Sequence, residues 1–130
     1  MKITYMDSEG VGHGLGLFNS GSFFEAHEAL EDVWRASPKP EKKFLQGLIQ
    51  VAVALHHHER GNLVGARSLL KRASRNLSLY PGTFGGVDLI SLLSSIAEWQ
   101  HALDEDTPVP PFPKIIFSRQ AVVVTTFDEE

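Results

Sequence analysis

The chain has 130 residues, of which 42% are hydrophobic and 22% charged, a composition that predicts one globular domain built around one core. Its formal net charge of −4 excludes an overall basic field, so we expect neither nucleic acid nor a membrane surface as a partner. The absence of cysteine excludes disulfides, thiolate metal sites and a cysteine nucleophile, and it fits a reducing cytoplasm. Residues 1–10 have no long apolar run, and the longest run in an expected helix is 51–55, so we expect no signal peptide or membrane span and a cytoplasmic location.

The first half of the chain predicts three helices. Residues 10–18 carry apolar side chains at helical spacing, but four glycines among them weaken that helix. Ser22 and Glu25 form a capping-box pattern ahead of an apolar run, which predicts a helix over about 22–36. After two prolines, another helix is expected over about 40–60.

Two further helices complete the expected bundle. Gly61 is a terminating residue and Asn62 an N-cap for a third strong helix, which ends at Pro81. Apolar residues on one side of 87–104 predict the last helix. We therefore expect an all-α fold, a single bundle of about four to five helices within residues 1–107.

The C-terminal residues 108–130 differ in composition and are expected to form a separate tail. The segment 108–113 is PVPPFP, which predicts a stiff extended chain. The apolar runs 115–117 and 121–127 have the composition of strands. Such a tail could lie on the bundle, be disordered, or pair with another chain, so a protein partner or self-association through it is conceivable.

One polar cluster stands out in the helix expected over 22–36. In the stretch HEALEDVW, His27, Glu31 and Trp34 fall on or beside the apolar face. An ionisable group that faces inward is costly unless it is paired or ligated. We therefore expect a partner for His27 and Glu31 from a neighbouring helix.

The next helix offers that partner. Gln46, Gln50 and His57 lie on one narrow stripe of it, and the short connection makes the two helices antiparallel neighbours. Counting outward from the turn places Glu31 level with Gln46 and His27 level with Gln50. His57 is expected near the far end, and His56 points about 100° away from it.

These residues carry a resemblance to a known family. The hallmark H-x-x-x-E-x-x-W/Y is met by His27, Glu31 and Trp34, and the sequence resembles the family called domain of unknown function 309. The resembling segments, which cover most of the chain, are 17–35, 44–62, 65–70 and, more loosely, 110–115. The resemblance implies an all-helical fold and binding of a metal, and members are also described as metal-dependent hydrolases.

The metal hypothesis assigns a role to each polar residue. His27, Glu31 and His57 would be the ligands, with His56 a weaker candidate for the third place. Imidazole and carboxylate suit a divalent ion such as zinc, manganese, iron or nickel. A hydrolytic site also needs an open position for water and a general base, for which Glu28 is the candidate. Trp34, Gln46 and Gln50 would then line the pocket.

A second hypothesis needs no metal. HEALE lacks the second histidine of the H-E-x-x-H motif, and the di-iron pattern would need two E-x-x-H helices. His27 and Glu31 would instead form a charge-assisted hydrogen bond, and Gln46 and Gln50 would complete a structural polar network. The chain would then be a non-enzymatic interaction or scaffold domain. A metal-free catalytic or ligand pocket is the third alternative.

Overall fold

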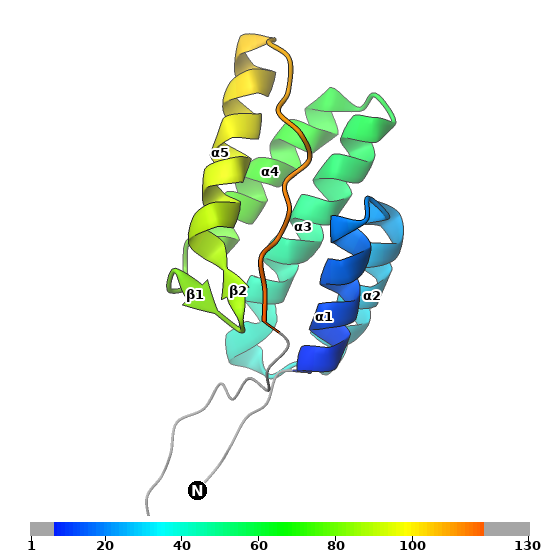
Figure 1. Ribbon diagram of the computed structural model, residues 1–130, viewed down its shortest axis with the longest axis vertical. Helices are drawn as coiled ribbons and strands as arrows, with labels where there is room; N and C mark the ends of the chain where they lie inside the picture. The colour runs from blue at the N-terminus through cyan, green and yellow to red at the C-terminus, as the bar shows by residue number, and fades with distance from the viewer. Residues whose placement is uncertain (1–6, 119–130) are drawn as a thin grey trace, which may run out of the picture.

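The computed structural model describes residues 7–118, and this part of the chain forms five α-helices, one short 3-10 helix and a two-stranded hairpin (Figure 1). The expected all-α class is confirmed. Helices run antiparallel to their neighbours in sequence, because the connections are short. The elements are α1 (Ser8–Asn19), α2 (Phe23–Ala36), η1 (Lys39–Glu41), α3 (Lys42–Glu59), α4 (Leu63–Leu77), β1 (Thr83–Phe84), β2 (Val87–Asp88) and α5 (Leu89–Glu105).

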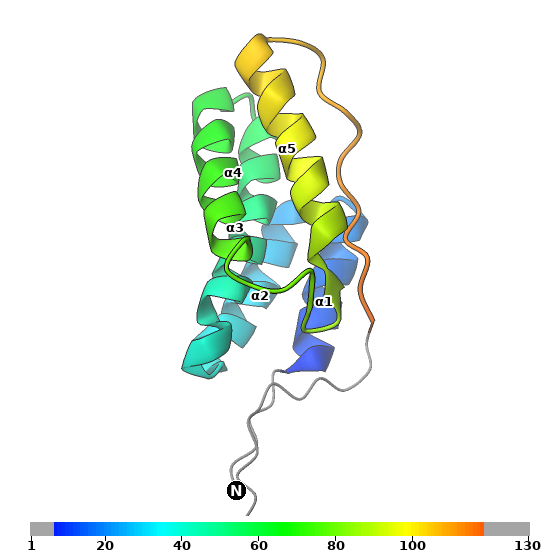
Figure 2. The same cartoon turned by 90° about the vertical axis from the view of Figure 1, so that its left-hand side faces the viewer.

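The helices form two layers around the core. α3 packs between α2 and α4, and these three helices lie side by side. Figures 1 and 2 agree that α1, α5 and the C-terminal segment all lie on one side of this layer. The opposite side of the α2–α3–α4 layer, here called the outer face, is left uncovered by residues 7–118. Helices of the described chain are all too short or too polar to cross a membrane.

The glycines of α1 allow a close approach to α2. A Cβ on Gly14 would lie 2.7 Å from Cγ of Leu30, and one on Gly10 would lie 2.7 Å from Cγ2 of Val33. The same glycines that lower helix propensity therefore stabilise α1 through packing. At its start, Oδ1 of Asp7 accepts a hydrogen bond from the Gly10 amide at 2.9 Å and caps the helix.

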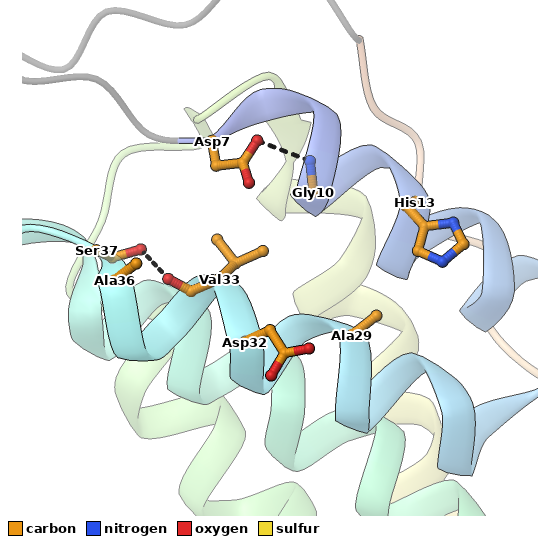
Figure 3. A pocket seen from close by; sticks show the side chains of 8 residues that line it. All are labelled: Asp7, Gly10, His13, Ala29, Asp32, Val33, Ala36 and Ser37. Carbon is orange, nitrogen blue, oxygen red and sulfur yellow. Dashed lines mark hydrogen bonds between the residues drawn. The ribbon is translucent and has the colours of Figure 1, made fainter.

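A shallow hollow of about 390 Å³ separates the exposed edges of α1 and α2 (Figure 3). Asp7 faces it while capping α1, and Asp32 pairs with Arg35 at 2.6 Å. The third polar group, His13, is exposed and lies apart from both carboxylates in Figure 3. Because both acids already have partners, we assign no ligand to this hollow.

The predicted caps between α3 and α4 are confirmed, but the predicted capping box of α2 is not. Asn62 caps α4 through its Oδ1, which accepts from the Gly65 amide at 3.0 Å, and Gly61 has the positive φ of 78° expected after α3. Ser22 is the N-cap of α2, but its side chain makes no capping hydrogen bond. The predicted capping box is therefore not formed.

The last helix, expected from about residue 87, begins two residues later, and an unexpected hairpin precedes it. β1 pairs with β2 through the turn residues Gly85 and Gly86, both with positive φ. α5 begins only after Asp88, whose carboxylate accepts from the backbone and hydroxyl of Ser91 at 3.0 and 2.8 Å. The backbone hydrogen bond, and then the hydroxyl, lower the pKa of Asp88.

The described part of the tail packs along the bundle as an extended segment (Figure 1). The Phe112 ring stacks on Trp99 at 5.7 Å, and the Trp99 indole donates to the Pro111 carbonyl at 3.1 Å. The Asn19 side chain makes two hydrogen bonds to the backbone of Ile115, at 2.9 and 2.7 Å. Of the two predicted strands, 115–117 forms a single bridge, at Phe117, and 121–127 lies outside the described residues.

A carboxylate is buried where α3 begins. Glu41 is fully buried, and neither of its oxygens has a hydrogen-bond partner within residues 7–118. Removal from water disfavours the charged form, so burial raises the pKa of Glu41, although its own backbone amide lowers it in part. This group was not singled out by the sequence, since only the three-dimensional packing buries it.

Candidate functional site

The His27–Glu31 pair forms on α2, but at the surface of the bundle. Nε2 of His27 lies 3.3 Å from Oε2 of Glu31, and their side chains are 22% and 40% exposed. Glu31 also reaches Arg35 at 3.5 Å. The pair was expected to face inward; it lies instead in a depression between α2 and α3 on the outer face, where solvent moderates the cost of its charge.

The structure brings the glutamines of α3 to this pair. A pocket of about 260 Å³ is lined by polar residues from both helices and by apolar residues, including one from α4. Counting residues from the α2–α3 turn therefore correctly predicts that the polar residues of the two helices lie side by side. The lining residues are His27, Glu31, Trp34, Gln46, Ile49, Gln50, Val53 and Leu69.

The hydrogen bonds of the predicted polar network are not made. Oε1 of Gln50 accepts from Nδ2 of Asn76 on α4 at 2.9 Å, and Gln46 is exposed. Within residues 7–118 neither glutamine bonds to His27 or Glu31, because α4 supplies Gln50 with a closer partner. The expected network across α2 and α3 is therefore reduced to the His27–Glu31 pair and its contact with Arg35 on α2.

Two buried donors or acceptors in this pocket have no partner. Nδ1 of His27 and Nε1 of Trp34 are buried without a hydrogen bond to any described residue. The unpaired Nδ1 favours the tautomer in which the proton is on Nε2, the nitrogen nearer to Glu31, because a buried N–H without an acceptor would cost more. The Lys42 ammonium lies 4.4 Å from the Trp34 ring centroid and bonds to the Trp34 carbonyl.

His56 and His57 lie beside the pair without joining it. The ring of Phe24 lies 5.7 Å from that of His27 and 5.4 Å from that of His56, so Phe24 contacts both imidazoles. Nδ1 of His57 is 3.3 Å from Nδ2 of Asn62, in the turn to α4. His57 therefore takes part in the α3–α4 connection.

These side chains define a second, mostly apolar pocket of about 210 Å³, lined by Phe24, His27, Val53, His56 and His57. It adjoins the first pocket, since His27 and Val53 line both. The two adjoining pockets along the α2–α3 seam are together called the groove here. Glu28, the candidate base, is exposed and lines neither pocket.

The groove does not supply the ligand set that a metal centre requires. No three His, Asp or Glu side chains within residues 7–118 are close enough together to hold one ion. His27 and Glu31 are near enough to share an ion, since zinc bonds are about 2.0–2.2 Å long, but within residues 7–118 no third such side chain joins them. A ligating histidine also normally donates its second ring N–H to an acceptor, which Nδ1 of His27 lacks.

The segment that carries the groove matches a known protein family. The sequence model of the family described as "Domain of unknown function (DUF309)" matches residues 11–69. That segment belongs to the DUF309 family. It contains every residue that lines the groove, from Phe24 to Leu69, whereas the β1–β2 hairpin and α5 lie outside it.

Two proteins that carry no functional description are similar to part of this chain. An "Uncharacterized protein" of Aquifex aeolicus (strain VF5) is 35% identical over 82 residues, which are 62% of this chain and 25% of that protein. "Uncharacterized protein YpuF" of Bacillus subtilis (strain 168) is 46% identical over 56 residues, 42% of this chain and 32% of its own length. The chain thus spans a quarter to a third of the relatives that it matches.

Proposed function

We propose that this chain is a non-enzymatic interaction domain, which docks a protein surface on the outer face of its α2–α3–α4 layer. The observation that carries the proposal is the groove itself, two adjoining pockets that stay open along a helix seam. Phe24 at its rim is 47% exposed, although a phenylalanine normally gains about 1.5–3 kcal/mol from full burial. A large apolar ring left in solvent beside a groove is typical of a docking site.

The donor set is the reason to prefer docking over metal chemistry. A hydrolytic metal centre needs about three protein ligands, a water position and a base. Here no third His, Asp or Glu of residues 7–118 joins the His27–Glu31 pair, and the candidate base Glu28 is exposed and lines neither pocket of the groove. The pair instead offers a polar contact, flanked by Phe24 and Trp34, of the kind that fixes register in an interface.

Site-specific photo-crosslinking in the cells that make the protein tests this proposal. A benzophenone-bearing phenylalanine would replace Phe24, and a matched control would replace Ile90, which is 69% exposed on α5. We expect a discrete covalent adduct with a protein from position 24 and none from position 90. No adduct, or the same adducts from both positions, would exclude docking at the groove.

A further inference from the structure

The two edges of the outer face carry opposite charges. α2 has four acidic residues and one arginine, whereas α4 has four basic residues and no acidic one. Between them, α3 presents uncharged glutamines, Val53 and histidines. The acidic residues are Glu25, Glu28, Glu31 and Asp32, and the basic residues are Arg67, Lys71, Arg72 and Arg75. Three of these face away from the outer face: Asp32 lines the hollow toward α1, and Arg67 and Lys71 line a hollow toward α5, where Arg67 pairs with Asp104.

We propose that the occupant of the outer face is a second copy of this chain, in a two-fold dimer with its axis parallel to α3. Such an axis exchanges the two edges, so that α2 of each copy lies over α4 of the other. An in-plane axis perpendicular to α3 would instead place α2 on α2 and α4 on α4, with like charges opposed. This inference names the partner of the docking face and therefore rests on the proposed function.

The positions along the helices agree with this arrangement. Counting outward from the α2–α3 turn puts Glu28 about level with Gln50, and counting outward from the α3–α4 turn puts Arg72 about level with the same residue. The two charged residues are thus at nearly the same height along the layer, at opposite edges. Both are exposed, and neither has an ion-pair partner within residues 7–118. The dimer would place Glu28 of each copy opposite Arg72 of the other.

The size of the face is close to what a dimer requires. α2, with 14 residues, is roughly 21 Å long, and three helices packed about 9 Å apart are roughly 27 Å wide. The flat area is therefore roughly 570 Å², and side-chain relief makes the accessible area larger. A stable interface buries about 800 Å² from each partner, so most of this face would have to take part.

Analytical ultracentrifugation of the whole chain at low salt, over a range of concentrations, tests the dimer. We expect reversible dimerisation that weakens with added salt. Arg72→Glu or Glu28→Arg alone places like charges opposite each other twice per dimer, and each should raise the dissociation constant by about tenfold. The double variant restores both pairs with reversed polarity, and its dissociation constant should return to within about threefold of the parent value.

Lys71→Glu is the matched control, because it changes the charge of α4 equally at a position that lines a hollow toward α5, with Gln100 and Asp104. It should leave the dissociation constant nearly unchanged. A chain that stays monomeric up to about 1 mM, an equal effect of Lys71→Glu, or a double variant no better than the single ones would overturn the dimer. If the position-24 crosslink then joins a different protein, the docking function stands and only its partner changes; an adduct of twice 14.4 kDa supports both.

Discussion

The packing of α1 on α2 leads to a prediction that separates helix propensity from steric fit. Gly14→Ala and Gly16→Ala make the same chemical change two residues apart in α1. A helical alanine is favoured over glycine by about 1 kcal/mol. At Gly16 nothing lies within 4 Å of the added Cβ, so we expect a gain of roughly 0.5–1 kcal/mol in the free energy of unfolding.

At Gly14 the same Cβ would lie 2.7 Å from Cγ and Cδ2 of Leu30, whose side chain is fully buried and cannot easily move away. Overpacking of this kind costs about 1–3 kcal/mol, which equals or exceeds the propensity gain. Urea unfolding of both variants, analysed by linear extrapolation, should therefore place Gly14→Ala about 1–3 kcal/mol below Gly16→Ala. Equal stability of the two variants would show that α1 and α2 are not held at this distance.

Three other predictions concern the groove, the C-terminal segment and Glu41. Untagged protein incubated with zinc, manganese or iron(II) should contain no stoichiometric metal by mass spectrometry. Bound metal that is lost in His27→Ala but retained in the control His101→Ala would favour the metal hypothesis instead. Asn19→Ala removes two hydrogen bonds to Ile115 and should cost about 1–3 kcal/mol, with faster amide exchange of the C-terminal segment than in Ser20→Ala. Because burial raises the pKa of Glu41 in the folded state, the folded state binds more protons than the unfolded state, and stability falls as pH rises above about 4.3. Glu41→Gln should therefore be more stable than the parent near pH 7. If thermal unfolding shows the same advantage at pH 4, the buried charge is not its cause.

Periodicity and cap chemistry predicted most of the helices, because each signal is local. Asn62 caps α4 and Gly61 follows α3 as the sequence indicates. The weak first helix could not be judged locally, since its glycines are compensated by Leu30 and Val33 of another helix. The β1–β2 hairpin did have a local signal, the Gly85–Gly86 dipeptide between β-compatible residues, which could have located it.

At the candidate site, too, local signals were predictive and contacts with other helices were not. The level of His27 with Gln50 followed from counting residues away from a short turn, and the structure places both in one pocket. The hydrogen-bond partners did not follow, because they depend on how a third helix is rotated. Asn76 of α4 donates a hydrogen bond to Gln50, and the side-chain amide of Asn62 lies within hydrogen-bond distance of the His57 ring. A helical wheel of two helices has no information about those choices.

The position of the His27–Glu31 pair explains why one motif suggests both a core and a site. A helix in a three-helix layer has its apolar stripe turned to the second layer, and residues at the margin of that stripe meet the neighbouring helix. His27 and Glu31 occupy this margin on α2, so a wheel places them beside the buried Leu30 while solvent still reaches them. If a second layer of helices covered the outer face, the pair would become buried and would have to be matched by polar groups from above. In the proposed dimer α4 of the second copy lies over α2, so the exposed Arg72 and Arg75 of that copy would supply polar groups above the pair.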